Sequence, residues 1–373
     1  MAWTERYVRA DAAGGGNGTT DTNSGANGAW TFLESLTAVV GGQRVNVRAG
    51  TYSNTTNTRT SAVAGTVTAP IWFRGFNTTP GDCDVDPTLA RPELTFTTGY
   101  LRVNGAFHIY SNLNVTGAST TVGVIRVDLG ADVIIDRCKL ENTAEATGAN
   151  AIAAGNRGKI SRCYLKSTTT ANSIAATTAS EQLFFGCVFD GGNVGILQSG
   201  QSLSVKNCVF RGQSNYGIHL SAATSRLLDI SNCTFYSTGA DAIRLTGGPS
   251  SGVIINNLFS NITGYGINNA SGANLGNLLR VGNVFYSCSL GNENGFGDFP
   301  SLSEQTETAS PFANAGVGNL ALSTTAKARA GGQPQLMENQ SYTNYIDAGA
   351  VQTDFSPAEI AAYLWTTAGR TTT

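Results

Sequence analysis

One pattern of apolar and polar residues recurs through the middle of the chain. In residues 203–210 apolar side chains alternate with polar ones, and a cysteine stands two residues before a phenylalanine. The cysteine position recurs at Cys138, Cys163, Cys187, Cys208 and Cys233, and asparagine takes it at Asn257 and Asn283. These positions lie 21 to 26 residues apart. Such a constant spacing is the period of a repeat protein.

Two further apolar ladders share this period. One consists of Ile125, Ile152, Ile174, Ile196, Ile218, Ile243 and Ile267. The other falls two residues after the cysteine position, at Leu140, Leu165, Phe189, Phe210, Phe235, Phe259 and Phe285. Each repeat therefore offers three short alternating stretches, which predicts three parallel sheets around a narrow core. A leucine-rich repeat would need a leucine-asparagine pattern and often one helix per turn, and neither is present.

The N-terminal region adds a second kind of pattern. A strand-like segment at 6–11 and a Gly/Asn/Thr-rich loop at 14–28 precede residues 29–40, where Phe32, Leu33, Leu36, Val39 and Val40 have helical spacing. A strand and turn follow at 44–52, with the pattern Val-x-Val-x-x-Gly-x-Tyr, and another strand at 70–75. The order of these segments resembles the start of right-handed parallel β-helix proteins of the pectate-lyase-like superfamily. Residues 347–350 are similar to their closing Asp-x-Gly-Ala motif.

The resemblance implies an all-β protein, a right-handed three-sheet parallel β-helix with a short N-terminal capping helix and a short C-terminal helix. We expect residues 1–60 to form the N-terminal strand, loop, capping helix and first rung, and residues 61–290 to form the β-helix. Residues 291–352 are expected to be an irregular C-terminal cap. Ser356 and Pro357 would start a helix at 358–365, followed by a flexible Thr-rich tail within 353–373.

Composition and charge limit the kinds of partner that we expect for this protein. Only 13% of residues are charged and the net charge is −2, so we expect no nucleic acid partner. The chain has no apolar run long enough for a membrane span and no signal-peptide pattern, which predicts a protein folded in a cytoplasm and no membrane partner. The ladder cysteines should be buried thiols, since strands stacked about 4.8 Å apart hold Cβ atoms beyond disulfide reach. Cys83 and Cys288 lie outside the ladder.

Candidate chemistry lies one residue beyond the isoleucine ladder, where side chains should point outward. That row reads Arg126, Ala153, Ala175, Leu197, His219, Arg244 and Asn268. His219 or Asp241 could act as an acid or base, and Arg244 could neutralise a uronate carboxylate. Arg126, His219, Arg244 and Asn268 are the candidate ligand-binding residues. The alternative is a polar row that only keeps the sheet soluble.

Carboxylates supply two further hypotheses. Asp82, Asp84 and Asp86 alternate in one loop and could bind calcium, although the glycine and distal glutamate of a helix-loop-helix calcium site are absent. No other cofactor is expected, and a solvated loop is the alternative. Glycoside hydrolysis would need two carboxyl groups about 5–9.5 Å apart, which Asp190 and Asp229 could supply. Asparagines at 207, 232 and 256 form a row that we interpret as a turn-stabilising stack.

These residues leave several functions open. The superfamily's pectate lyases gather acidic residues around calcium beside a catalytic arginine, and its polygalacturonases present three aspartates near Gly-His-Gly, but this chain has neither arrangement. It is similar to β-helix proteins of bacteriophage particles. That resemblance implies a virion-associated structural or adhesion protein (capsid decoration, fibre or tail spike).

In that role it would be assembled in the host cytoplasm, contact other virion proteins, form a homo-oligomer such as a trimer and present a face to carbohydrate. The first alternative is a polysaccharide lyase or glycoside hydrolase with a polymer bound along the β-helix face. The second is a cell-surface carbohydrate-binding or ice-adsorbing solenoid, although no regular Thr-x-Thr array is present.

Overall fold

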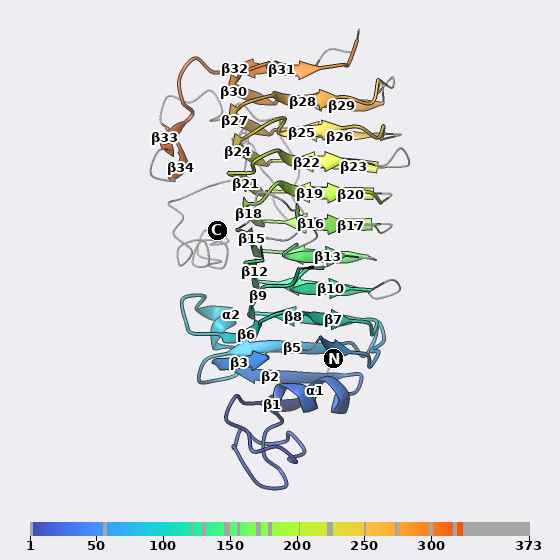
Figure 1. Ribbon diagram of the computed structural model, residues 1–373, viewed down its shortest axis with the longest axis vertical. Coiled ribbons are helices and arrows are strands. Elements are labelled where there is room, and N and C mark those ends of the chain that lie inside the picture. Colours follow the sequence, from blue (N-terminus) through green and yellow to red (C-terminus); the bar gives the residue numbers. More distant parts are fainter. Residues whose placement is uncertain are drawn as a thin grey trace, which may run out of the picture. The chain divides into compact units, whose positions relative to one another are not determined.

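The computed structural model describes most of residues 3–323. The exceptions in that range are residues 55–57, 121, 129–131, 145–149, 155–156, 169–172, 178–180, 201, 222–226, 250, 273–274, 276, 298–300 and 316–318. The chain divides into two compact units at residues 175 and 176, within β16 (Ser173–Thr177). In each unit the chain passes in turn through three parallel sheets, which we call A, B and C (Figure 1).

The first unit contains the earlier turns of the coil. Its sheet A has β1 (Thr4–Val8), β2 (Gln43–Arg48), β5 (Ile71–Phe76), β8 (His108–Ser111), β11 (Val133–Asp136) and β14 (Gly158–Ser161). Sheet B has β3 (Gly50–Asn54), β6 (Pro92–Phe96), β9 (Asn114–Gly117), β12 (Lys139–Asn142) and β15 (Tyr164–Ser167). Sheet C has β4 (Arg59–Ser61), β7 (Leu101–Val103), β10 (Ile125–Val127) and β13 (Ile152–Ala154).

The second unit repeats the order. Its sheet A has β17 (Glu181–Phe185), β20 (Ser202–Lys206), β23 (Leu227–Ser231), β26 (Ser251–Ile255) and β29 (Leu278–Val281). Sheet B has β18 (Val188–Gly191), β21 (Val209–Arg211), β24 (Thr234–Thr238), β27 (Leu258–Ile262), β30 (Val284–Cys288) and β32 (Gln305–Thr306). Sheet C has β19 (Val194–Gln198), β22 (Tyr216–Leu220), β25 (Ile243–Leu245), β28 (Tyr265–Asn269) and β31 (Gly291–Asn294). The predicted all-β, three-sheet parallel solenoid is confirmed.

The apolar ladders form the interior of each unit. In the second unit Phe189, Phe210, Phe235, Phe259 and Phe285 are all buried and stack in sequence. Their ring centroids are 4.5 to 5.1 Å apart and their planes lie within 8° of parallel. Parallel in-register strands place identical side chains over one another, so one residue type can fill the same place in every turn.

The cysteine ladder is also a hydrogen-bond ladder. The five ladder cysteines are fully buried free thiols, as predicted, and Cys83 and Cys288 are free thiols too. The Cys187 backbone N–H donates to Sγ of Cys208, one turn on, at 3.4 Å. The Cys233 N–H donates to Oδ1 of Asn257 at 2.9 Å, and the Asn257 N–H to Oδ1 of Asn283 at 3.0 Å. Asparagine therefore replaces cysteine because its side-chain oxygen accepts the same bond.

A single left-handed residue links sheet A to sheet B in several turns. Asn207, Asn232 and Asn256 have φ of 54°, 54° and 55°, and Arg137 and Arg162 both have φ of 53°. Asparagine tolerates this region better than most residues because its side chain can bond locally. The asparagines of the predicted row do lie in turns, and the stack between them stays a prediction. Arginine is a less usual choice at such a position.

The N-terminal helix is shorter than expected. α1 spans Phe32–Ala38, and Thr31 caps it in a capping box with Glu34. Phe32 packs against Tyr52 and Phe73, with ring centroids 5.9 and 6.3 Å apart. The predicted apolar face is only partly correct, since Leu33 and Val40 are exposed.

The parallel sheets extend beyond the expected boundary at residue 290, because β31 and β32 continue them to Thr306.

An antiparallel pair of strands, β33 (Phe312–Asn314) and β34 (Asn319–Leu322), follows those sheets. The expected C-terminal helix and tail at 353–373 lie outside the described residues, as does the Asp-x-Gly-Ala motif. Within the part of the chain that is described, no helix is both long and apolar enough to cross a membrane.

Candidate functional site

Sheet C of the second unit carries the polar row that the sequence predicted. His219 on β22 pairs in register with Arg244 on β25, and Arg244 pairs with Asn268 on β28. Leu197 precedes His219 and Asn294 follows Asn268 in the same row. We call these five residues the His219 row. Because neighbouring strands lie about 4.8 Å apart, His219 and Arg244 start from adjacent backbone positions.

Asp241 binds two residues of this row, Arg244 and Asn268. Its side chain is buried, and Oδ1 accepts the Tyr265 backbone N–H at 2.9 Å. Oδ2 accepts from Nδ2 of Asn268 at 2.8 Å and pairs with Nη1 of Arg244 at 3.2 Å. A buried carboxylate held by three donors is poorly placed to exchange a proton with a ligand. The acid or base role predicted for Asp241 is therefore corrected: it positions Arg244 and Asn268.

An aromatic ring that the sequence reading overlooked fixes Arg244 from another side. The guanidinium lies over the ring of Tyr216, 5.0 Å from its centroid, and the same ring lies 5.1 Å from the imidazole of His219. Cation–π contact of this kind holds an arginine in one place while leaving its charge available. Tyr216 stands three residues before His219, so the strand alternation alone did not mark it.

The imidazole of His219 is oriented by one hydroxyl. Nε2 lies 2.9 Å from Oγ1 of Thr246, and this hydroxyl is also 3.0 Å from the Leu220 carbonyl oxygen. Nδ1 makes no hydrogen bond with a described residue. Burial, and then the positive charge of Arg244, lower the pKa of His219 below its ordinary value. Because the ordinary pKa of histidine is about 6.5, a lowered pKa leaves the ring neutral at pH 7.

Arg126, the fourth predicted ligand-binding residue, belongs to the first unit. It pairs in register with Ala153 and with Arg102. Arg102 and Arg126 share the carboxylate of Asp128, at 2.5 and 2.8 Å. Two half-exposed arginines on adjacent strands thus lie over one carboxylate. The structure does not group Arg126 with His219, Arg244 and Asn268.

The carboxylate pair suggested for a hydrolase does not form. Asp190 lies on β18 in sheet B, where Arg211 binds it through two nitrogen atoms at 3.1 and 3.0 Å. Asp229 lies on β23 in sheet A, where Lys206 binds it at 2.7 Å. The two residues sit on different sheets of the coil and have separate cationic partners. Within one chain, the structure therefore gives no sign that these two residues act as a catalytic pair.

The three aspartates of the acidic loop also have separate partners. Asp82 begins α2 (Asp82–Val85), and although burial opposes it, the backbone N–H groups of residues 77–79 lower its pKa to about 2. Asp84 contacts Arg74, Asn112 and Arg137. Asp86 accepts bonds from Thr88. Among the described residues no three acidic, histidine or cysteine side chains gather as a metal site, so the three aspartates do not form the predicted calcium centre.

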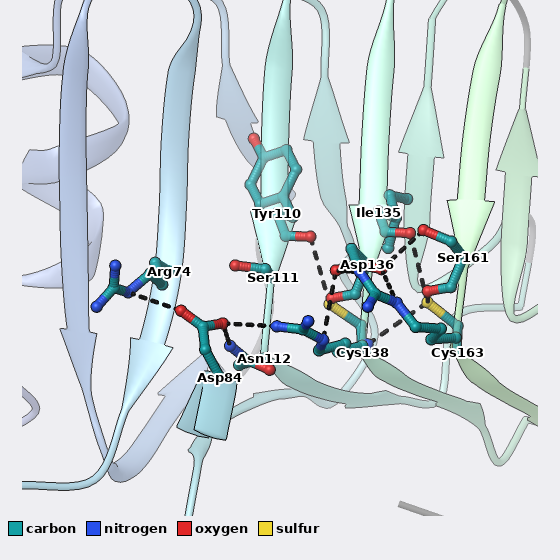
Figure 2. A network of polar contacts seen from close by, with 12 residues as sticks. Arg74, Asp84, Tyr110, Ser111, Asn112, Ile135, Asp136, Cys138, Ser161 and Cys163 are labelled. Atoms are coloured by element: carbon teal, nitrogen blue, oxygen red, sulfur yellow. Dashed lines mark hydrogen bonds and ion pairs between the residues drawn. The ribbon is translucent and has the colours of Figure 1, made fainter. Parts of the chain in front are cut away.

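A groove of about 420 Å³ lies on sheet A of the first unit. We call it the sheet A groove. Its lining residues are Trp72, Asp84, Ile109, Ser111, Ile134, Asp136, Arg137, Lys159, Ser161 and Arg162. Figure 2 shows the polar network along its side, with Arg74, Asp84 and Asn112 near one end and Asp136 beside Ser161 near the other. Trp72, Ile109, Ile134 and Lys159 form one outward row on successive strands.

Two arginines in left-handed turns bind this network together. Arg137 donates to Oδ1 of Asp84 at 2.9 Å, although the two residues are 53 positions apart in the chain. Arg162 binds Asp136 through Nε and Nη2, and Ser161 donates to the same carboxylate at 2.7 Å. The sequence reading missed this groove. Arginine at positions 137 and 162, where later repeats have asparagine at 207, 232 and 256, was the visible signal.

Comparison with known proteins places the fold. Residues 102–285 match a family model described as a right handed beta helix region. No curated protein matched the sequence. Among solved structures, the pectate lyase Pel9A aligns with 95% of this chain and 97% of its own, at 16% identity and a TM-score of 0.55. A rhamnogalacturonan lyase aligns with 97% of this chain and 98% of its own, at 12% identity and a TM-score of 0.54.

A third similar structure is an alginate lyase from Paenibacillus sp. str. FPU-7. It aligns with 74% of this chain and 94% of its own, at 14% identity and a TM-score of 0.51. Identities this low establish a shared fold and leave activity to be argued from side chains. The chain therefore has the right-handed parallel β-helix fold.

Proposed function

We propose that the protein binds an acidic polysaccharide across the His219 row and cleaves it as a lyase. The observation that carries this proposal is the in-register pairing of the His219 imidazole with a guanidinium that Asp241 and Tyr216 hold in place on the adjacent strand. Lyase chemistry on a uronate needs both: a cation to stabilise the carboxylate and a base to remove the proton beside it.

Arg244 is the group for the carboxylate. Asp241 and Tyr216 hold its guanidinium from two sides, and its side chain keeps about a third of its surface exposed. A guanidinium offers paired N–H donors that match a carboxylate. When the proton beside that carboxylate leaves, negative charge spreads onto the carboxylate oxygens, and Arg244 stabilises it.

His219 is the base. With the Thr246 hydroxyl donating to the Leu220 carbonyl, Nε2–H donates to the hydroxyl and Nδ1 carries the lone pair. The proton on the carbon beside the carboxylate moves to Nδ1. The electron pair forms a carbon–carbon double bond and the bond to the glycosidic oxygen breaks. Water protonates the leaving alkoxide, and the resulting hydroxide takes the proton from the imidazolium, so atoms and charge balance and His219 returns to its neutral form.

A hydrolase fits this site less well. Hydrolysis of a glycoside uses two carboxyl groups on either side of the bond. The carboxylate that contacts the His219 row, that of Asp241, is buried and accepts hydrogen bonds from three donors. Elimination requires no such pair, and it suits a histidine beside an arginine.

The test is incubation with polygalacturonate, alginate, rhamnogalacturonan and neutral glucans, with calcium and with a chelator. A lyase produces a conjugated unsaturated uronate, which absorbs in the ultraviolet, whereas a hydrolase produces reducing ends without that absorbance. His219→Gln and Arg244→Ala should each remove the absorbance. Arg157→Ala is the matched control, because Arg157 is 61% exposed and its charge lies outside the His219 row.

Loss of activity in Arg157→Ala as well as in the row variants would argue against the site. Silence of the wild-type protein across all acidic polymers would exclude the lyase. The virion-associated adhesion role, with its oligomer and virion partners, stays a prediction from sequence, because neither the fold nor the comparisons point to a virion. Particle association and molar mass in solution would test it separately.

A further inference from the structure

We propose that the sheet A groove of the first unit is a second carbohydrate site, which binds an anionic sugar residue without cleaving it. The site lies on sheet A, whereas the His219 row lies on sheet C of the second unit, so it does not depend on the proposed cleavage. A volume of about 420 Å³ falls within the usual range for small-molecule sites, about 300–1,000 Å³.

The groove has an excess of positive charge. Its lining contains three cationic side chains, Arg137, Lys159 and Arg162, and two carboxylates, Asp84 and Asp136. Three minus two leaves a formal charge of +1. Both carboxylates are bound by arginine, Asp84 by Arg137 and Asp136 by Arg162. They therefore hold the groove together and are poorly placed to attract a cation.

Lys159 carries the uncompensated charge. Its side chain is exposed on β14, and it forms no ion pair with a described residue. Three other lysines on the strands are paired: Lys139 and Lys166 with Glu141, and Lys206 with Asp229. An ammonium at the edge of a built groove, with the acids beside it already occupied, selects for an anion.

The floor of the groove explains why the anion should be part of a sugar. Ile109 and Ile134 lie side by side between Trp72 and Lys159 in the same outward row. Ile134 is 38% exposed, so part of its apolar surface is open to a ligand. A pyranose ring has an apolar face of C–H groups that can cover such a floor. Its hydroxyl groups would meet Ser111 and Ser161 in the neighbouring row.

The walls are held rigidly, which favours binding by lowering the ordering cost. Nε1 of Trp72 donates to Oγ of Ser111 at 2.8 Å, and Arg44 and Arg74 lie over its ring. These contacts hold Trp72 in place at one end of the outward row that lines the groove. Uronic acids and sulfated sugars share the required chemistry, a negative group on a pyranose ring.

The test is acylation of lysines in the full-length protein, read by peptide mass spectrometry with and without ligand. The probes are oligogalacturonate, a sulfated oligosaccharide and a neutral maltooligosaccharide. We expect the two charged probes to slow acylation of Lys159 and the neutral one to leave it unchanged. Lys206, which is paired on sheet A of the second unit, is the internal control and should not respond.

Ile134→Glu adds a negative charge to the exposed floor and should weaken protection by about tenfold in ligand concentration. His219→Gln should leave protection of Lys159 unchanged while removing cleavage, which separates this proposal from the proposed function. Unchanged acylation of Lys159 at saturating charged ligand overturns the proposal. Equal protection by the neutral sugar, or equal protection of Lys206, overturns it too.

Discussion

Nε2 of His219 lies 2.9 Å from Oγ1 of Thr246, the residue that follows β25. The contact joins two neighbouring turns of the coil. It also makes the two ring nitrogens different, because only Nε2 has a hydrogen-bond partner among the described residues. One nitrogen is committed to the protein and the other, Nδ1, is left for a ligand. A single hydroxyl group thus orients the imidazole that we propose as the base.

Thr246→Val should reduce turnover without loss of fold. Valine keeps the shape but removes the partner of Nε2, so the imidazole can rotate and exchange tautomers. We expect Thr246→Val to lower kcat more than it changes KM and to shift the acid limb of the pH profile. Thr246→Ser keeps a hydroxyl group and should restore both kcat and the pH profile. Nitrogen chemical shifts of the His219 ring would report the tautomer directly. A Thr246→Val enzyme with an unchanged tautomer and pH profile would contradict the role of the hydroxyl.

Acid should destabilise the protein below the ordinary histidine range. Burial lowers the pKa of His108 in the folded state, although its bond to the Val63 carbonyl, 2.7 Å away, opposes the shift. The unfolded chain, with a histidine pKa of about 6.5, then binds the proton first. Stability is therefore constant above that pH and falls as the pH drops below it.

His108→Gln should flatten this slope, because glutamine can donate to Val63 but does not titrate. The measurement is the urea midpoint between neutral pH and the onset of carboxylate titration. Glu293 acts in the opposite direction, since burial raises its pKa and the folded state takes up that proton first. His219, whose pKa is also lowered, adds a slope of the same sign as His108, and comparing the wild-type protein with His108→Gln removes the contributions of both Glu293 and His219. Identical slopes in the two proteins would show that His108 is not responsible.

The fold could be predicted because the side chains that fill the interior recur with the period of the repeat. Phe235 and Ile243 each have the same neighbour one turn earlier and later, so spacing alone revealed the sheets and their register. The pairing of His219 with Arg244 followed from the same register. Outward contacts obey no such period. The burial of Asp241, and the approach of Asp84 to Arg137, depend on loop paths that the repeat does not specify.

Phe235→Ala should cost about 3–5 kcal/mol of unfolding free energy, the range for truncating a buried phenylalanine. The ring is fully buried and stacks on Phe210 and Phe259, so the cavity would interrupt the ladder in both directions. Leu227→Ala is the control, because that side chain is 53% exposed and its loss should cost no more than about 0.5 kcal/mol. Urea unfolding, with hydrogen exchange at β24, measures both. An equal loss of unfolding free energy in Phe235→Ala and Leu227→Ala would mean that the phenylalanine stack contributes little to stability.

Asp84 and Asp86 should differ sharply although they are two residues apart. Asp84 lies between Arg137 at 2.9 Å and the buried Arg74 at 3.5 Å, so Asp84→Ala leaves a buried guanidinium without this partner. Breaking a buried pair typically costs about 3–5 kcal/mol, and partial exposure of Asp84 reduces the expectation to about 1–3 kcal/mol. Asp86→Ala removes only bonds to Thr88 in an exposed loop, and no measurable change is expected.

The effect of calcium on Tm distinguishes aspartates bound to Arg137 and Thr88 from the calcium site that the sequence suggested. A cation held by the loop would raise Tm in proportion to its binding, and both substitutions would remove that gain. With the carboxylates committed to Arg137 and Thr88, calcium or a chelator should leave Tm unchanged, and only Asp84→Ala should lower it. A calcium-dependent rise in Tm that disappears in both variants would restore the metal site, because only a shared ligand makes the two aspartates equivalent.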